Sequence, residues 1–386
     1  MRIAFSVVKN ITGGGGIEKY TSELGSRLVR RGHEVTVYAM RHYGDVPEHH
    51  LGMRIVSVPS FAAPCLQKLS CSMTAAIKSS LEKYDIVHMH SFPPCAFAWI
   101  PKLRGAKCVL QVHGLGLEWK NKPWGSLTWS VVKILEKLAL SQSHINTAVS
   151  RAQCAFYQSQ RGIEMQYIPT AADVKPKAEA REIHQLGLEP KKYIFFACRM
   201  VPEKGVHYLV SAFRRLDTDM KLVIAGDIQR ATEYVKHVFK LAEGDRRILF
   251  PGFAEGRLLE ELFSNCYIYA HPSEAEGLSL SILEAMSYGN CCLVSDIPAN
   301  LEAIGDAGFH FSNKSVDDLT ACLSWLLKNP AEVEAVNTYA VERIRQCYSW
   351  ESISEQIEKL YLSILNGQPY TSEEKAPLSQ SISIHR

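Results

Sequence analysis

Short apolar runs alternate along the first half of the chain with segments whose apolar positions recur at helical spacing. The runs at residues 3–8, 34–40, 86–89, 108–112 and 145–149 predict strands, and residues 17–31 predict an amphipathic helix. Strands that are apolar throughout are covered on both faces of their sheet. The alternation therefore predicts a parallel sheet between two layers of helices.

The same alternation stops near residues 170–176 and then begins again. Strands are expected at 193–198, 221–225, 267–270 and 292–295, with helices at 206–216, near 232–242 and from about Ser281. The sequence thus predicts an α/β fold of two doubly wound Rossmann-like domains, 1–172 and 173–347, that face a cleft. We expect a last helix at 348–365 to pack back on the first domain, and a disordered tail at 366–386, which is rich in Ser, Pro and Glu.

Composition and charge narrow the function classes. Apolar residues make up 46% of the 386 positions and charged residues 22%, and no run is long enough to span a membrane or resembles a secretion signal. These features predict a cytoplasmic protein. Residues 1–172 carry 20 Lys and Arg against 10 Asp and Glu, whereas residues 173–386 carry 23 against 30. The basic half fits an anionic partner, either nucleic acid or lipid headgroups, or else is a chance excess on a solvated face.

Metal and disulfide chemistry is not expected. The 11 cysteines show no CxxC or Cys/His ligand spacing, which favours buried thiols in a reducing compartment. Asp217 and Asp219 match a DxD pattern that binds divalent cations elsewhere, but they fall between a helix end and a strand start, away from the cleft. His88 and His90 share one strand face without a third ligand, which favours core or cleft-lining histidines. We therefore expect a metal-independent protein without cofactors.

Three loops at strand ends carry candidate chemistry. The glycines at 13–16 lie between a strand and a helix, where backbone N–H groups can approach a phosphate. Arg199 and Lys204 follow the first strand of the second domain and could converge on one pyrophosphate. Glu276 and Glu284 lie eight residues apart in a strand–turn–helix segment, and carboxylates there suit the recognition of hydroxyl groups.

These motifs, taken in their order along the chain, resemble a known family over residues 1 to about 365. The matching pieces are the glycines 13–16 with Glu18, the segments 31–35, 85–90, 112–114, 199–205, 225–227 and 252–253, and the Glu276-x7-Glu284 signature that ends in Ala285-Met286. The chain resembles a family 4 retaining glycosyltransferase of the GT-B class, whose members have two Rossmann-like domains.

The resemblance implies roles for individual residues. The first domain would bind the acceptor and the second the nucleotide sugar. The donor diphosphate would contact Gly15, Gly16, Arg199 and Lys204, and His113 would lie near the anomeric centre. Glu276 would bind hydroxyls of the donor sugar and Glu284 the nucleotide ribose; Gly277 and Leu278 belong to the same donor loop. His113, Arg199, Lys204 and Glu276 are thus the catalytic candidates. The sequence departs from the family at Thr170-Ala171-Ala172 in the hinge, at Leu278-Ser279, and at His271, to which no role is assigned.

The implied function is hexosyl transfer with retention, from a nucleotide-diphosphate sugar to a glycan or lipid-linked acceptor in cell-surface polysaccharide biosynthesis. A UDP-sugar is the first choice of donor and GDP-mannose the second. No protein nucleophile is required, because the acceptor proton can pass to a donor phosphate oxygen. A nucleic-acid partner is not implied. The alternatives are a sugar-nucleotide epimerase of the same architecture and a non-catalytic nucleotide-sugar-binding protein.

One segment bears on the membrane. Residues 117–129, continuing to Lys133 and Lys137, hold Trp119, Trp124 and Trp129 among lysines. Interfacial tryptophans with basic neighbours are typical of an element that lies on an anionic membrane surface, which would make the enzyme peripheral to the cell membrane. The alternative is a helix whose tryptophans pack against the sheet.

Overall fold

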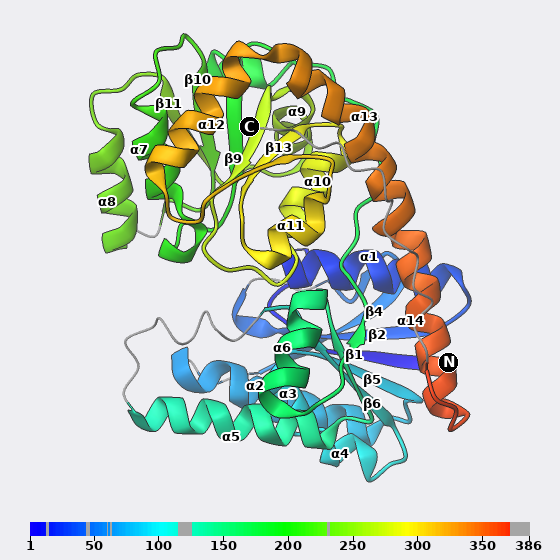
Figure 1. The fold of residues 1–386 in the computed structure, drawn as a ribbon. Helices are drawn as coiled ribbons and strands as arrows, with labels where there is room; N and C mark the ends of the chain where they lie inside the picture. Colours follow the sequence, from blue (N-terminus) through cyan, green and yellow to red (C-terminus); the bar gives the residue numbers. More distant parts are fainter. Residues whose placement is uncertain are drawn as a thin grey trace. The chain divides into compact units, whose positions relative to one another are not determined.

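The computed structural model describes residues 1–12, 15–43, 47–59, 61, 64–114, 126–229 and 232–370. These residues form two compact units (Figure 1). The N-terminal unit contains residues 1–170 and also takes in the chain from Trp350 onward, and the C-terminal unit contains Ala171–Ser349. The expected boundary was at 172/173. The tail from residue 371 lies outside the described residues.

In the described part of the N-terminal unit, eight strands form one sheet in the order β3-β4-β2-β1-β5-β6-β7-β8. Every neighbouring pair is parallel except β3 and β4. The strands are β1 Arg2–Val8, β2 Glu34–Met40, β3 His49–His50, β4 Met53–Val58, β5 Ile86–His90, β6 Lys107–Val112, β7 Ile145–Ala148 and β8 Gln166–Tyr167. The helices are α1 Gly16–Arg30, α2 Pro64–Leu81, α3 Phe92–Cys95, α4 Trp99–Lys102, α5 Ser126–Gln142, α6 Arg151–Arg161 and α14 Trp350–Leu365.

Helix α14 returns to the N-terminal unit and packs along α1. The guanidinium of Arg31 donates to Glu358 and Glu351 at 2.7 Å each, and His33 Nε2 lies 2.7 Å from the other oxygen of Glu358. These contacts hold the pKa of Glu358 below its usual range despite its partial burial. On the inner side of α14, the Tyr361 hydroxyl lies 2.6 Å from His88 Nδ1 on β5. The Arg31-Gly32-His33 motif therefore anchors a helix more than 300 residues away in sequence.

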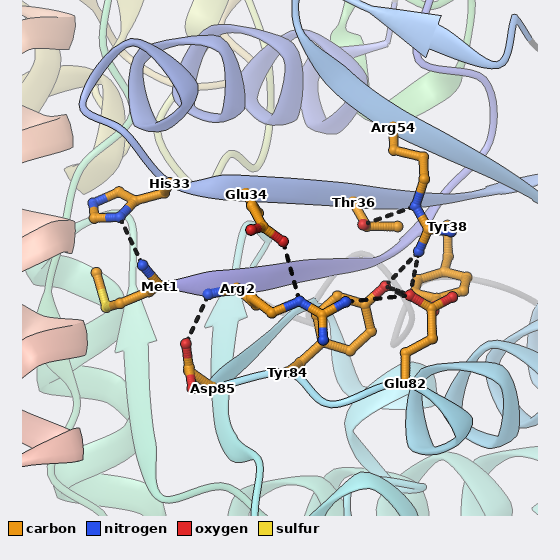
Figure 2. Close-up of polar contacts among 10 residues, drawn as sticks. All are labelled: Met1, Arg2, His33, Glu34, Thr36, Tyr38, Arg54, Glu82, Tyr84 and Asp85. Atoms are coloured by element: carbon orange, nitrogen blue, oxygen red, sulfur yellow. Dashed lines mark hydrogen bonds and ion pairs between the residues drawn. The ribbon is translucent and has the colours of Figure 1, made fainter.

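A polar cluster ties together the amino-terminal ends of these strands, at the edge of the sheet opposite the strand C-termini (Figure 2). The backbone N–H of Arg2 donates to Asp85 at 2.7 Å, and its side chain donates to Glu34 at 3.1 Å. Arg54 on β4 pairs with Glu82 and donates to the Tyr84 hydroxyl at 3.0 Å. This end of the sheet is internally satisfied, which leaves the carboxyl ends of the strands as the place where ligands can be bound.

In the C-terminal unit, six strands form an all-parallel sheet in the order β11-β10-β9-β12-β13-β14, as far as the chain is described. They are β9 Tyr193–Ala197, β10 Lys221–Ala225, β11 Ile248–Gly252, β12 Ile268–His271, β13 Cys291–Ser295 and β14 Phe309–Phe311. The helices are α7 Val206–Phe213, α8 Glu233–Ala242, α9 Gly256–Asn265, α10 Leu280–Ser287, α11 Pro298–Ile304, α12 Val316–Lys328 and α13 Pro330–Cys347.

The predicted fold class, with two doubly wound units built on parallel sheets, is confirmed. Each predicted strand is present, with ends that differ by about one residue, as is normal for such boundaries. The last helix was predicted from residue 348, which is wrong: Tyr348 caps the preceding helix α13, and α14 begins at Trp350. Helices α12 and α13 and strand β14 had not been predicted.

Candidate active site

The switch point of the C-terminal sheet lies between β9 and β12. Strand β9 pairs with β10 on one side and β12 on the other, so the order of strands reverses there. In open α/β sheets, ligands bind beyond the strand C-termini at such a point. The loop after β9 carries Arg199 and Lys204, and the loop after β12 carries Glu276. The topology therefore brings these two separate sequence signals to one place.

A buried ion pair joins the two loops. Lys204 Nζ lies 2.5 Å from Glu276 Oε1, and His271 Nε2 lies 3.0 Å from the same oxygen. The Glu276 carboxylate is 8% exposed and His271 is 1% exposed. Burial alone would raise the pKa of Glu276, but the Lys204 ammonium and the His271 ring outweigh burial and hold this pKa well below its usual range. The site therefore contains a fixed carboxylate at neutral pH.

The protonation of His271 follows from its surroundings. Burial lowers its pKa more strongly than Glu276 raises it, so the ring is neutral. An ionised carboxylate only accepts hydrogen bonds, and Nε2 must therefore carry the ring proton and donate it to Glu276. Ser273 Oγ is 3.0 Å from the same Nε2, while the buried Nδ1 has no hydrogen-bond partner among the described residues. His271, to which the sequence assigned no role, thus orients Glu276.

Close backbone packing holds the two loops together. Gly205 has φ +66°, and a Cβ there would lie 2.1 Å from the Pro272 carbonyl oxygen. Only glycine fits at this approach. The backbone N–H of Glu274 donates to the Glu203 carbonyl at 2.9 Å, and Ser295 Oγ donates to the Ser273 carbonyl at 2.5 Å. The Lys204–Glu276 pair therefore rests on a braced support that includes the start of β13's following loop.

Arg199 differs from Lys204 in being uncommitted. Its side chain is exposed and makes no hydrogen bond or ion pair with any residue that the structure describes. It lies near Cys198, as do Lys204 and Glu276; burial raises the pKa of the Cys198 thiol to about 12. Gly277 and Leu278 are buried in the loop after Glu276, and Glu284 lies one turn into α10. One exposed guanidinium thus stands beside a neutralised lysine–carboxylate pair.

In the N-terminal unit, the first βα turn is shaped by a buried carboxylate. Glu18 is 7% exposed and accepts a hydrogen bond from the backbone N–H of Lys9 at 3.0 Å. A Cβ on Gly15 would lie 2.0 Å from Glu18 Oε2. Gly15 precedes α1 and Gly16 is its first residue, so both lie at the positive end of that helix. Gly13 and Gly14 lie outside the described residues.

His113, which follows β6, is held by a chain of hydrogen bonds. Thr21 Oγ1 donates to the Ile17 carbonyl at 2.8 Å and lies 2.9 Å from His90 Nε2; His90 Nδ1 lies 3.0 Å from His113 Nε2. Because the Thr21 proton is already donated, His90 Nε2 must donate to Thr21. Burial holds the pKa of His90 well below its usual range, so this ring is neutral and its Nδ1 accepts from His113 Nε2. Burial also lowers the pKa of His113 to about 3, which leaves its Nδ1 unprotonated.

Lys68 on α2 is a residue of this region that the sequence did not single out. Burial lowers its pKa to about 8, and Lys9 lowers it further against the opposing charge of Glu18. His90 and His113 feel the charge of Lys68 in turn. No ion-pair partner for Lys68 exists in the described part of the chain. A single lysine in an amphipathic helix gives no sequence signal.

Known proteins with this architecture were compared with the chain. A model of the Glycosyltransferase Family 4 domain matches residues 14–175, and a model of the Glycosyl transferases group 1 domain matches residues 178–343. The MMP α-(1→4)-mannosyltransferase of Mycolicibacterium hassiacum is 25% identical, with 94% of this chain and 98% of that protein covered. A GDP-mannose-dependent α-mannosyltransferase of Corynebacterium glutamicum is 24% identical, covering 95% and 89%.

Solved structures share the whole fold. The sucrose-phosphate synthase of Thermosynechococcus elongatus superimposes with a TM-score of 0.82 at 18% identity, over 95% of this chain and 100% of that one. Anabaena HepE in complex with UDP-glucose gives 0.78 at 18% identity, over 94% and 100%. The chain belongs to the family 4 glycosyltransferases of the GT-B class. The family resemblance stated from the sequence is therefore confirmed.

The structure of this glycosyltransferase unites the sequence-predicted residues within each unit. Lys204 and Glu276 are in direct contact, with Arg199 nearby in the same group of charges. Gly15, Gly16 and His113 lie in the N-terminal unit, where His113 and the βα turn share Lys68 and Glu18 as charged neighbours. The residues missed were His271, Thr21, His90 as a partner of His113, and Lys68. Only His271 had a signal, as a polar residue ending an otherwise apolar strand.

Metal independence of the glycosyltransferase is the first prediction. Asp217 and Asp219 lie between α7 and β10, at the end of β10 opposite the strand C-termini, and the Asp219 side chain is 86% exposed. Because hard cations in transferases bridge substrate phosphates, a carboxylate pair so far from Arg199 has no reaction to serve. Turnover should survive excess EDTA, and Asp217→Ala/Asp219→Ala should retain full activity. Loss of turnover that Mn²⁺ restores would contradict this placement.

Proposed function

We propose that this glycosyltransferase moves a hexosyl group from a nucleotide-diphosphate sugar to an acceptor hydroxyl with retained anomeric configuration. The observation that carries the proposal is the braced Lys204–Glu276 pair beside the uncommitted Arg199, at the switch point of the C-terminal sheet. Cations suit a diphosphate that gains negative charge as it leaves, and a fixed carboxylate suits sugar hydroxyls.

The proposed roles follow from charge and position. Arg199 would bind the donor diphosphate by a planar fork of N–H donors, with Lys204 as a point charge on the same group. Glu276, oriented by His271, would accept hydrogen bonds from the sugar. Glu284, Gly277 and Leu278 keep their proposed places around the donor, and Gly15 and Gly16 their proposed role toward the diphosphate. His113 would contact the sugar near its anomeric carbon.

The reaction balances without a protein nucleophile. The bond between the anomeric carbon and the β-phosphate oxygen breaks, and its electron pair leaves with the nucleoside diphosphate. The acceptor oxygen forms the new bond on the same face of the sugar, and its proton passes to an oxygen of the leaving phosphate. The residues of this chain would hold the diphosphate and the cationic sugar, which is electrostatic preorganisation rather than covalent catalysis.

Donor and acceptor are narrowed by the relatives. HepE of Anabaena was solved with UDP-glucose, and a Corynebacterium glutamicum relative is named as GDP-mannose-dependent. We propose a UDP-sugar as donor, with GDP-mannose second. The acceptor is a glycan or a lipid-linked glycan of cell-surface polysaccharide biosynthesis, and the enzyme would then work at the cytoplasmic face of the membrane. Among the described residues, none of the helices combines the length and apolar character needed to span a bilayer.

Two other functions fit the architecture less well. An epimerase of this fold would need a carboxylate set for proton chemistry at C2 of the sugar, whereas the Glu276 carboxylate is held ionised by Lys204. A non-catalytic nucleotide-sugar-binding protein would leave unexplained the neutral His113 with its unprotonated Nδ1.

Ligand-dependent stabilisation tests the donor. A ligand at 100 times its Kd stabilises the protein that binds it by about 2.7 kcal/mol. We therefore expect one nucleotide sugar from a panel of UDP-, GDP-, ADP- and dTDP-sugars to raise the melting temperature clearly above the rest. The shift should disappear in Arg199→Ala. Equal, small shifts for all nucleotide sugars would contradict a donor site in this chain.

The hydrogen-bond chain to His113 gives a further prediction. Thr21→Val keeps the shape of the side chain but leaves His90 Nε2 without its acceptor, so the His90 proton moves to Nδ1 and is donated to His113 Nε2. The His113 proton is thereby forced onto Nδ1. We expect kcat to fall by about tenfold with little change in donor KM. Thr21→Ser, which keeps the hydroxyl, is the matched control. Nitrogen-15 NMR of the histidine rings reads the tautomers directly, and unchanged tautomers in Thr21→Val would contradict the chain.

A further inference from the structure

Three helices of the N-terminal unit expose apolar side chains in rows. On α2, Met73, Ile77 and Leu81 are spaced by four residues and are 42%, 45% and 74% exposed. On α5, Val131, Ile134 and Leu138 recur at i, i+3 and i+7 and are 42%, 58% and 41% exposed. This spacing places each set on one side of its helix. Apolar rows of this kind normally face a core, and here they face away from it.

The rows belong to one face of the unit. Helix α3 packs against both α2 and α5, and α2 packs against α4, where Trp99 and Leu103 are 50% and 76% exposed at a spacing of four. Figure 1 shows α2, α4 and α5 on one side of the N-terminal sheet and α1 on the other. We call the eight exposed side chains of these helices the apolar face. Contiguous exposed apolar patches on soluble domains mark interaction sites.

The apolar face is set in positive charge. Helices α2, α4 and α5 together contain five lysines and a single acidic residue. The acid, Glu136, is ion-paired with Arg161 at 3.3 Å, with 15% of its side chain exposed. Lys133 and Lys137 are exposed between the apolar positions of α5, and Arg104 is exposed just after α4. The partner of this face should therefore be apolar in part and anionic at its edge.

We propose that the apolar face docks on the surface of an anionic lipid bilayer. The apolar side chains would enter the boundary between headgroups and acyl chains, while Lys133 and Lys137 lie at the level of the lipid phosphates. A second copy of the chain fits less well, since a symmetric contact of this face would set lysines against lysines. The inference deepens the proposed function, on which it rests for one step: an acceptor carried on a lipid would be within reach of a docked enzyme.

The basic, Trp-containing segment singled out in the sequence adjoins this face along the chain. Residues 115–125 lie outside the described residues, as do the side chains of residues 126–129. The proposal therefore rests on α2, α4 and α5 and needs no placement of those tryptophans.

Co-sedimentation of the full chain with vesicles tests the proposal. Vesicles of phosphatidylcholine alone are compared with vesicles that also contain phosphatidylglycerol, at low and high salt. We expect the wild type to pellet only with the anionic vesicles and less at high salt, because exposed charges are screened beyond about 8 Å at physiological ionic strength. Wild type that stays in the supernatant with anionic vesicles at low salt would overturn the proposal.

Two variants locate the contact. Ile134→Ser/Leu138→Ser should weaken vesicle binding by about tenfold or more at every salt concentration, because apolar insertion is not screened. Lys133→Glu/Lys137→Glu should weaken binding by about tenfold or more at low salt and much less at high salt. Matched controls on the C-terminal unit are Phe239→Ser/Phe253→Ser and Lys236→Glu/Lys240→Glu, which change equally exposed positions and should bind like wild type. Equal effects of the controls would overturn the assignment.

Two further measurements separate the outcomes. Sedimentation velocity of wild type and Ile134→Ser/Leu138→Ser reveals a second copy as the occupant, if a dimer of the wild type dissociates in the variant; that result would overturn the bilayer. Donor hydrolysis without acceptor or vesicles should be unchanged in both variants. Failure of the wild type to hydrolyse any donor would count against the proposed function alone, because vesicle binding is measured independently of it.

Discussion

Arg199→Ala should lower kcat/KM for the donor by about 10²-fold or more, equivalent to about 3 kcal/mol of transition-state stabilisation. The guanidinium is exposed and makes no hydrogen bond or ion pair with the described residues, so its donors are available to a ligand. A diphosphate gains charge as it leaves, and a planar fork of donors meets that charge in the transition state more strongly than in the ground state. Steady-state kinetics with the best donor measures the change.

The same lack of contacts makes the variant well suited to interpretation. Removing a side chain that touches no described residue should leave the circular dichroism spectrum and melting temperature unchanged. Arg215→Ala is the matched control, since Arg215 lies on the surface of the same unit in an exposed pair with Asp317. Arg199→Ala activity within about threefold of the wild type would show that Arg199 does not bind the leaving group.

Lys204→Met should damage both activity and stability. Lys204 is the closest cation to the buried Glu276 carboxylate, and removing one partner of a buried pair costs about 3 kcal/mol or more because the other charge stays buried. We expect a loss of activity at least as large as for Arg199→Ala, together with a lower free energy of unfolding in urea. Lys236→Met, in an exposed pair with Glu233, should change neither quantity.

A second change separates the two effects. In Lys204→Met/Glu276→Gln the uncompensated charge is gone, so stability should recover in large part while activity stays lost. Recovery of activity in the double variant would mean that the pair is structural, and would contradict the proposed roles of both residues.

The pH dependence of the pair has a defined sign. In the wild type the pKa of Glu276 lies below its ordinary value, so the pair contributes stability at neutral pH and loses it as the pH falls. In Lys204→Met the carboxyl no longer has its cation and takes up a proton more readily on acidification. The difference in unfolding free energy between wild type and Lys204→Met should therefore narrow as the pH is lowered from 7 toward about 4.3, the ordinary pKa of Glu.

Much of the fold could be predicted because buried parallel strands have a local signature. The run Tyr193–Ala197 is apolar throughout and is fully or largely buried, and its position along the chain was predicted to about one residue. Helices α12 and α13 were missed because their apolar positions alternate with many charges and no motif marks them. Their place follows from packing: Ile344 of α13 and Leu319 of α12 are buried in the C-terminal core.

The candidate site was predicted only as far as motifs reach. Arg199, Lys204 and Glu276 follow strands in a family pattern, and the topology of β9 and β12 brings them together. Partners that come from elsewhere in the chain have no such pattern. Thr21 meets His90 across 69 residues, and Arg31 meets Glu358 across 327. The sequence could name Arg31-Gly32-His33 as a family motif but could not show that it holds α14.

Incubation of the enzyme with single nucleotide sugars, without acceptor, tests the proposed reaction most directly. Proton NMR follows the anomeric signals and the released nucleotide over time. The account predicts slow formation of nucleoside diphosphate and free sugar from one donor, with the anomer of the donor formed first and the reaction lost in Arg199→Ala. Conversion to an isomeric nucleotide sugar, release of the inverted anomer first, or binding without any turnover would contradict it.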